Sequence, residues 1–197
     1  PMTFVPADRI LDKVEYTIQS IICRAEIQEE NGFILDSSYD RAFRDSLFNN
    51  MKKEVKLKEN EGVLEFNASL FNPLTLSGDV DSRVLKADQS NTAIIYSDKY
   101  FFKFYRKIER EINPDLEITR FLSESTNFQN SPKYSGSIVY REDDGTFVFG
   151  LMQEKVEHQG DSWVMTIDSV GRFYERVMAA GVKENLPKLL NKPAIKF

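Results

Sequence analysis

Residues 90–124 read SNTAIIYSDKYFFKFYRKIEREINPDLEITRFLSE, and the prediction of the fold starts from them. Residues 92–97 and 100–105 are rich in β-branched and aromatic side chains and flank the short turn Asp98-Lys99, which predicts a β-hairpin. Asn113-Pro114 predicts the start of a helix, because asparagine is a good N-cap and proline is favoured at the first helical position. The stretch therefore predicts strand, turn, strand and helix.

Lys103 lies in the middle of the aromatic run FFKFY, and it is the most informative residue of the stretch. An unpaired ammonium group in an apolar setting is costly, so Lys103 needs a partner. Glu117, in the first turn of the predicted helix, is the obvious candidate. The alternative is a strand lysine whose ammonium group reaches solvent past its apolar neighbours.

A strand lysine paired with a helix glutamate is the arrangement with which protein kinases hold the phosphates of ATP. The sequence around this pair resembles the maltokinase family, and most closely the maltokinase region that is fused behind bacterial trehalose synthase. The resemblance runs from about residue 32 to residue 177. The segments that carry it are ADQSNTA (87–93), FFKFYRK (101–107), INPDLEITRFL (112–122) and LMQEKVEHQGDSW (151–163).

The resemblance implies an α+β fold in three parts. Residues 1–80 are expected to form an N-terminal cap subdomain. Residues 81–160 are expected to form a kinase-like N-lobe, similar to that of aminoglycoside phosphotransferases, with an antiparallel five-stranded sheet, one flanking helix and the hinge. Residues 161–197 are expected to begin a helical C-lobe that is missing here.

Local patterns predict the remaining elements. Residues 15–27 and 33–36 predict two strands joined by a turn that contains Asn31-Gly32. Apolar residues spaced by four from Tyr39 to Met51 predict an amphipathic helix, and residues 56–62 predict a charged connector. Further strands are expected at 63–71, 83–88, 134–141 and 146–156, then a long helix from Asp161 to about Gly181 and a second one at 186–190.

Strand parity places Phe101 and Tyr105 on the face of Lys103, with Phe102 and Phe104 on the opposite face. If Lys103 contacts the α- and β-phosphates of ATP, Phe101 could stack on the adenine ring. Ordinary packing within the sheet is the alternative for Phe101.

Two further segments are candidate ATP contacts. Ser90, Asn91 and Thr92 occupy the turn where protein kinases use glycines to bring backbone N–H groups to the phosphates, and here hydroxyl and amide groups could donate instead. A simple polar turn is the alternative. The maltokinase resemblance also implies a hinge at residues 153–156, where the Gln153 carbonyl and the Lys155 N–H would bind adenine with Met152 behind the ring.

The segment His158-Gln159-Gly160-Asp161 could be mistaken for a catalytic loop. Because it precedes the predicted long helix, we interpret Asp161 or Ser162 as the helix cap. No catalytic residue and no metal site is expected in this chain. ATP and Mg²⁺ would be bound by the intact parent and not by this piece, which we expect to be inactive alone, because phosphoryl transfer requires ATP, metal and acceptor to be positioned together.

The composition restricts the classes of function. The net charge of −5 argues against a nucleic-acid or anionic-membrane surface, and no apolar run approaches the roughly 20 residues of a membrane helix. A single cysteine, Cys23, is typical of a cytoplasmic protein, and its apolar strand pattern predicts a buried side chain. The ends, Pro1-Met2 and Lys196-Phe197, predict a piece excised from a longer protein.

The resemblance thus implies part of a maltokinase-like phosphotransferase, which would transfer the γ-phosphate of ATP to maltose and give maltose 1-phosphate. The expected partners are the missing C-lobe and a trehalose synthase domain. One alternative is a non-catalytic kinase-like module attached to trehalose synthase, and another is a kinase with a different small acceptor.

Overall fold

The computed structural model describes residues 1–10, 18–59, 61–85, 91–158, 160 and 162–179. The chain divides into two compact units, Pro1–Val156 and Glu157–Phe197, which are described separately. The first unit holds two antiparallel sheets, so the predicted α+β class is confirmed. Among the described helices, none is both long and apolar enough to cross a membrane.

The smaller sheet has three strands in the order β1-β3-β2. These strands are β1 (Met2–Pro6), β2 (Ile21–Ile27) and β3 (Glu30–Asp36). The turn between β2 and β3 lies within the predicted residues 28–32, but Gln28 and Glu29 make it, with positive φ angles of 50° and 67°, and the Asn31-Gly32 pair does not. Gly32 lies inside β3, where a Cβ atom would come within 2.5 Å of the Val5 carbonyl oxygen.

Strand β2 is an edge strand of this sheet, and most of its side chains are exposed. Cys23 is accordingly exposed, which corrects the prediction of a buried thiol. The apolar pattern of β2 was misleading, because its side chains are mostly exposed among the described residues.

The larger sheet has seven strands instead of the five expected, in the order β4-β5-β9-β10-β8-β7-β6. The first four residues of the predicted charged connector form β4, which pairs with β5 at one edge. Residues assigned to the cap by sequence therefore divide between the two sheets. The strands are β4 (Lys56–Glu59), β5 (Gly62–Ala68), β6 (Ser82–Val84), β7 (Asn91–Tyr96), β8 (Tyr100–Tyr105), β9 (Tyr134–Glu142) and β10 (Gly145–Glu154).

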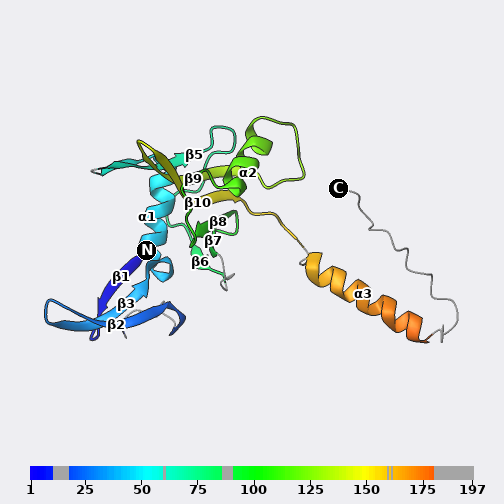
Figure 1. The fold of residues 1–197 in the computed structure, drawn as a ribbon, viewed down its shortest axis with the longest axis horizontal. Helices are drawn as coiled ribbons and strands as arrows, with labels where there is room; N and C mark the ends of the chain where they lie inside the picture. The colour runs from blue at the N-terminus through cyan, green and yellow to red at the C-terminus, as the bar shows by residue number, and fades with distance from the viewer. Residues whose placement is uncertain (11–17, 60, 86–90, 159, 161, 180–197) are drawn as a thin grey trace. The chain divides into compact units, whose positions relative to one another are not determined.

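The two faces of the large sheet pack against different helices (Figure 1). Helix α1 (Arg41–Lys52) contributes Leu47, Phe48 and Met51 to a core that also holds Phe102. Helix α2 (Pro114–Glu124) contributes Leu116 to a smaller cluster with Tyr105. The alternation predicted for residues 101–105 is therefore confirmed, because adjacent residues of β8 enter different cores.

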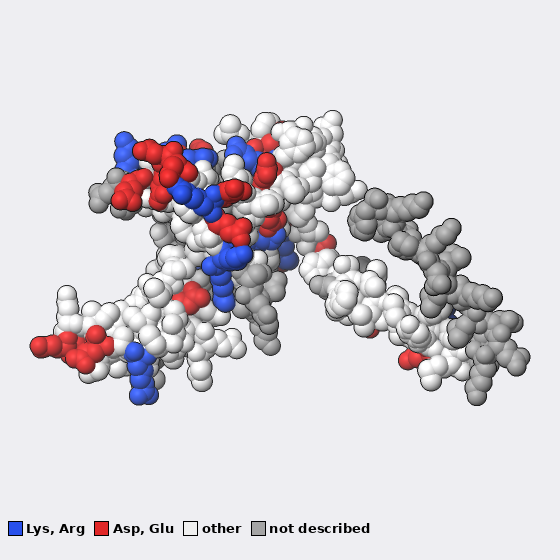
Figure 2. All heavy atoms as spheres, in the orientation of Figure 1, with Lys and Arg blue, Asp and Glu red and all other residues white. Residues whose placement is uncertain are grey.

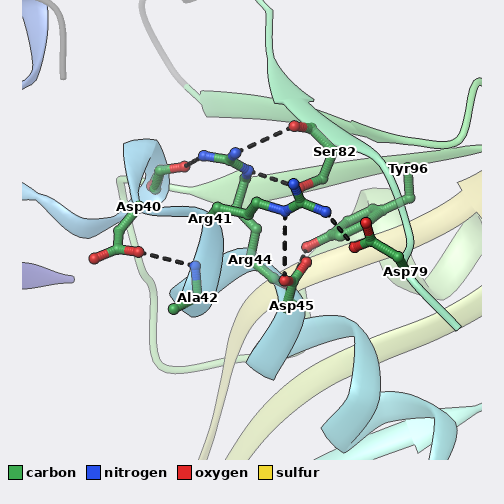
Figure 3. Close-up of polar contacts among 9 residues, drawn as sticks. Asp40, Arg41, Ala42, Arg44, Asp45, Asp79, Ser82 and Tyr96 are labelled. Atoms are coloured by element: carbon green, nitrogen blue, oxygen red, sulfur yellow. Dashed lines mark hydrogen bonds and ion pairs between the residues drawn. The ribbon is translucent and has the colours of Figure 1, made fainter. Parts of the chain in front are cut away.

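A network around Arg44 attaches helix α1 to the large sheet and to the end of the small one (Figure 3). The Arg44 side chain is 6% exposed, and its guanidinium group donates to Ser82 Oγ at 2.9 Å and to the Ser82 and Ser38 carbonyl oxygens, each at 3.1 Å. The Tyr96 hydroxyl donates to the Arg44 carbonyl oxygen at 2.9 Å. Asp40 caps the helix by accepting from the Ala42 N–H.

Charged side chains of both signs lie over the part of the sheet that carries β5 and β9 (Figure 2). Glu65 accepts from Lys56 Nζ and from Arg141 Nε, both at 2.9 Å. The hydrogen bonds from these two cations lower the pKa of the Glu65 carboxyl below its ordinary value. Charged side chains such as Lys56 on the edge strand β4 also disfavour pairing of this edge with a strand of another molecule.

Replacing Glu65 with glutamine should therefore destabilise the protein in a pH-dependent way. A carboxyl group whose pKa is lower in the folded than in the unfolded state stabilises the folded state. This stabilisation is complete at a pH above the unfolded-state pKa, and it is lost as the pH falls through the folded-state pKa. We expect E65Q to lower the free energy of unfolding by about 1 kcal/mol at pH 7 and by less at pH 3. The loss is small because Lys56 and Arg141, the partners of Glu65, are largely exposed. Urea unfolding at both pH values measures this, with E26Q on the exposed strand β2 as the control. A cost that is the same at both pH values would contradict the assignment.

The second unit contains helix α3 (Ser162–Ala179), where the sequence predicted a long helix. Trp163, Ile167, Val170 and Tyr174 recur at helical spacing and are exposed. The predicted helix at 186–190 and the predicted end near Gly181 lie outside the described residues.

Candidate functional site

The start of helix α2 positions the candidate site. Asn113 caps the helix as predicted, because its Oδ1 accepts from the Asp115 N–H at 2.9 Å, and Pro114 follows as the first helical residue. Asp115 is the next residue, in a first turn where the helix dipole favours a negative charge. Local sequence thus places Asp115 in the first turn of α2.

Lys103 lies on β8 and extends toward this carboxylate. Its Nζ donates to Asp115 Oδ2 at 2.8 Å, and the two side chains are 27% and 37% exposed. The Tyr105 hydroxyl donates to the same oxygen at 2.9 Å. Lys103 and Tyr105 therefore share one face and one acceptor, as strand parity requires.

Glu117 is not the partner that the structure gives to Lys103, which corrects the prediction. Two residues along a helix rotate a side chain by about 200°, so Asp115 and Glu117 point in nearly opposite directions. Glu117 is exposed, whereas Leu116 and Thr119 face the protein. Sequence reasoning missed Asp115, and the missed signal was its place directly after the cap and Pro114.

The Tyr105 hydroxyl is also part of this site. Strand parity in the sequence placed Tyr105 on the face of Lys103 but gave its hydroxyl group no role. Burial, together with the negative charge of Asp115, raises the pKa of Tyr105 well above its ordinary value. The hydroxyl therefore stays protonated at neutral pH and donates to the carboxylate. Tyr105 and Lys103 together hold the carboxylate in one position against the sheet.

Phe101 is half-buried and lies two residues before Lys103 on the same strand. It registers with Ile95 on β7 and Gln153 on β10. The predicted side of the sheet is thus confirmed, and stacking of Phe101 on adenine stays a prediction.

The three residues of the predicted polar turn differ in where they lie. Ser90 lies outside the described residues, and Asn91 belongs to β7, where it is paired with Tyr105 on the face of Lys103. Thr92 registers with Phe104, on the face opposite Lys103, and it is 2% exposed. Its hydroxyl oxygen accepts from Arg106 Nε at 3.1 Å, so the structure does not bring Thr92 toward Lys103, and its phosphate contact stays a prediction.

The predicted hinge contacts also differ from expectation. Met152 is fully buried in the core under α1, on the face opposite Lys103, so it does not lie behind a ring stacked on Phe101. The Lys155 N–H donates to the Lys99 carbonyl oxygen at 2.8 Å, and Lys155 Nζ pairs with Asp98 at 2.8 Å. The N–H expected to bind adenine is therefore engaged within the chain. Gln153 ends up half-buried near the end of β10.

His158 is exposed in the segment after β10, while Gln159 and Asp161 lie outside the described residues. Within the described part of the chain, no group of three or more His, Cys, Asp or Glu side chains is arranged to hold a metal ion. No protein-family model matches the sequence. The candidate site thus consists of Lys103, Asp115 and Tyr105, with Phe101 beside them.

Proposed function

We propose that this chain is the ATP-binding lobe of a longer, maltokinase-like phosphotransferase. The ion pair between Lys103 and Asp115 is the observation that carries the proposal. A lysine on an inner strand, held by an acidic residue on the following helix, is the group with which protein kinases bind the α- and β-phosphates of ATP. The half-buried ammonium group of Lys103 is a compact positive charge, which suits the binding of phosphates.

The order of the strands supports the same proposal. In protein kinases the lysine lies on the third strand of the N-lobe, and its acidic partner lies on the next helix. Here β6, β7 and β8 follow one another in the sheet, Lys103 is on β8, and α2 comes next in the chain. The strands β10 and β9 complete five antiparallel neighbours, and β4 and β5 extend the sheet beyond them.

The rest of the function follows from the sequence resemblance. In the proposal the parent transfers the γ-phosphate of ATP, with Mg²⁺, to maltose, and it is joined to a trehalose synthase domain in the cytoplasm. Lys103 orients the phosphates, Asp115 and Tyr105 hold Lys103, and the catalytic base and the metal ligands belong to the missing C-lobe. This chain alone would then bind ATP weakly and transfer no phosphate.

A second candidate is a non-catalytic kinase-like module, and two observations favour it. The Lys155 N–H is already bonded within the chain, and Thr92 faces away from Lys103. In such a module the pair of Lys103 and Asp115 would only stabilise the fold.

Asparagine at position 115 separates the two candidates. In the longer protein, D115N should lower kcat/KM for ATP by about 10- to 100-fold, because a hydrogen bond to a charged group contributes about 1.5–3 kcal/mol. E117Q is the matched control and should stay within about twofold of the wild type. Steady-state phosphorylation of maltose at varied ATP measures both. Equal, measurable activity of wild type and D115N would contradict the role given to the pair, whereas no phosphorylation of maltose by the wild type would favour the non-catalytic module.

A further inference from the structure

A cavity of about 1040 Å³ opens on the face of the large sheet that lies opposite Lys103. Phe43 and Leu47 of α1 line one part of the cavity, and Pro1 with Met2 and Ile22 of the small sheet lines another. The floor consists of side chains from neighbouring strands of the large sheet. They are Leu64, Phe66, Ile138, Tyr140, Phe149 and Phe104.

The floor is long and apolar. The lining residues run from Leu64 on β5 across β9, β10 and β8 to Thr92 on β7. Four steps between strands of about 4.8 Å each give a length of roughly 19 Å. A cavity of this volume, lined mostly by hydrophobic and aromatic side chains, has the dimensions of a small-molecule site. Its length favours a chain-like ligand.

Arg106 provides a charge at one end of the cavity. It is the sole basic side chain among the described lining residues. Its Nε donates to Thr92 at 3.1 Å, while its Nη2 lies 3.9 Å from Asp36 Oδ2, which is too far for a hydrogen bond. A guanidinium group has five N–H donors, so Arg106 retains donors for a further acceptor.

Ser38 holds the acidic neighbour of Arg106 in place at this end. Ser38 lines the cavity, and its N–H donates to Asp36 Oδ1 at 2.9 Å. The Asp36 carboxylate is therefore fixed beside Arg106, and Arg106 keeps donors that Asp36 does not use.

The second acidic lining residue, Glu61, is remote from Arg106. It precedes β5, whereas Arg106 follows β8, and β9 and β10 lie between these strands. Three steps between strands separate the two residues by roughly 14 Å. The polar end therefore holds Arg106 with the Asp36 carboxylate beside it, and apart from Glu61 the remainder of the described lining is mostly apolar.

We propose that this cavity binds an amphiphile with an unbranched hydrocarbon chain and one carboxylate group. The carboxylate accepts from Arg106 in place of its long contact with Asp36, and the chain lies along the floor toward Leu64. Because this site lies on the opposite face from Lys103, it does not depend on the proposed phosphotransferase function. Its ligand would bridge the small sheet, helix α1 and the large sheet.

Titration of the purified chain with tetradecanoate, below the concentration at which the acid forms micelles, tests the proposal. Isothermal calorimetry should show saturable binding of one molecule per chain. R106Q should weaken binding by about tenfold or more, because a charge-assisted contact is lost. R83Q is the matched control, since Arg83 is also an exposed arginine near an aspartate, Asp98 at 3.5 Å, and it should bind like the wild type.

A second variant tests the direction of the chain. L64W places a larger side chain at the far end of the floor. It should therefore weaken the binding of tetradecanoate and leave the binding of the shorter octanoate unchanged. Tetradecanol or tetradecylamine binding as tightly as tetradecanoate would overturn the proposal, as would full affinity in R106Q. Sedimentation equilibrium that shows a dimer unaffected by tetradecanoate would assign the cavity to a second copy of the chain and would also overturn it.

Discussion

Methionine in place of Lys103 should lower maltose phosphorylation about a hundred- to a thousandfold in the longer, maltokinase-like protein that we propose. That is the size of loss seen when a preorganised donor to a developing charge is removed. Methionine preserves most of the length and apolar stem of lysine, so the packing on β8 is retained. The loss should be measured as kcat and KM for ATP at saturating maltose.

The control for this substitution is K107M. Lys107 follows the same strand, but its side chain is 84% exposed and pairs with Glu109, so its loss should change activity by less than twofold. Circular dichroism and urea unfolding of K103M should match those of the wild type within about 1 kcal/mol. A folded K103M enzyme with full activity would remove the basis of the proposed function.

Methionine in place of Arg44 should have the largest effect on stability. The substitution removes three hydrogen bonds and leaves the buried carbonyl oxygens of Ser82 and Ser38 without these donors. We expect a loss of about 3 kcal/mol in the free energy of unfolding, since each buried unsatisfied group costs about 1–3 kcal/mol. For a chain of this size, Tm should fall by roughly 10 °C.

The matched control is R41M, one turn earlier on the same helix. Arg41 is 40% exposed and pairs with Asp79 and, at 3.7 Å, with Asp45, so its loss should cost less than about 1 kcal/mol. Urea unfolding of both variants, followed by circular dichroism, measures the difference. If R44M and R41M are equally stable, the Arg44 network does not hold α1 on the sheet.

The local parts of the site could be predicted from the sequence. Asn113-Pro114 fixed the start of α2 because capping depends on neighbouring residues alone. Alternation along β8 likewise assigned Phe101, Lys103 and Tyr105 to one face. The sequence did not show which face of α2 packs on the sheet. Asp115 and Glu117 lie two residues apart and therefore on nearly opposite faces of the helix, so the wrong acidic residue was chosen as the partner of Lys103.

Contacts between distant segments could not be predicted. The pairing of β5 with β9 adds two strands to the sheet, and it joins residues more than 60 positions apart. The bond from the Lys155 N–H to Lys99 is of the same kind. The apolar pattern of β2 likewise does not tell whether a second layer covers the strand, which is why Cys23 was misassigned.

A reactive ATP derivative tests the central claim, that Lys103 lies beside the phosphates of bound ATP. An acyl group attached to the terminal phosphate of ATP is transferred to a lysine amine near the phosphates, and mass spectrometry then identifies the lysine. In the longer protein, we predict that Lys103 is acylated and that excess ATP prevents this. Acylation of Lys103 that ATP does not reduce, or that is no greater than that of Lys107, would contradict the account.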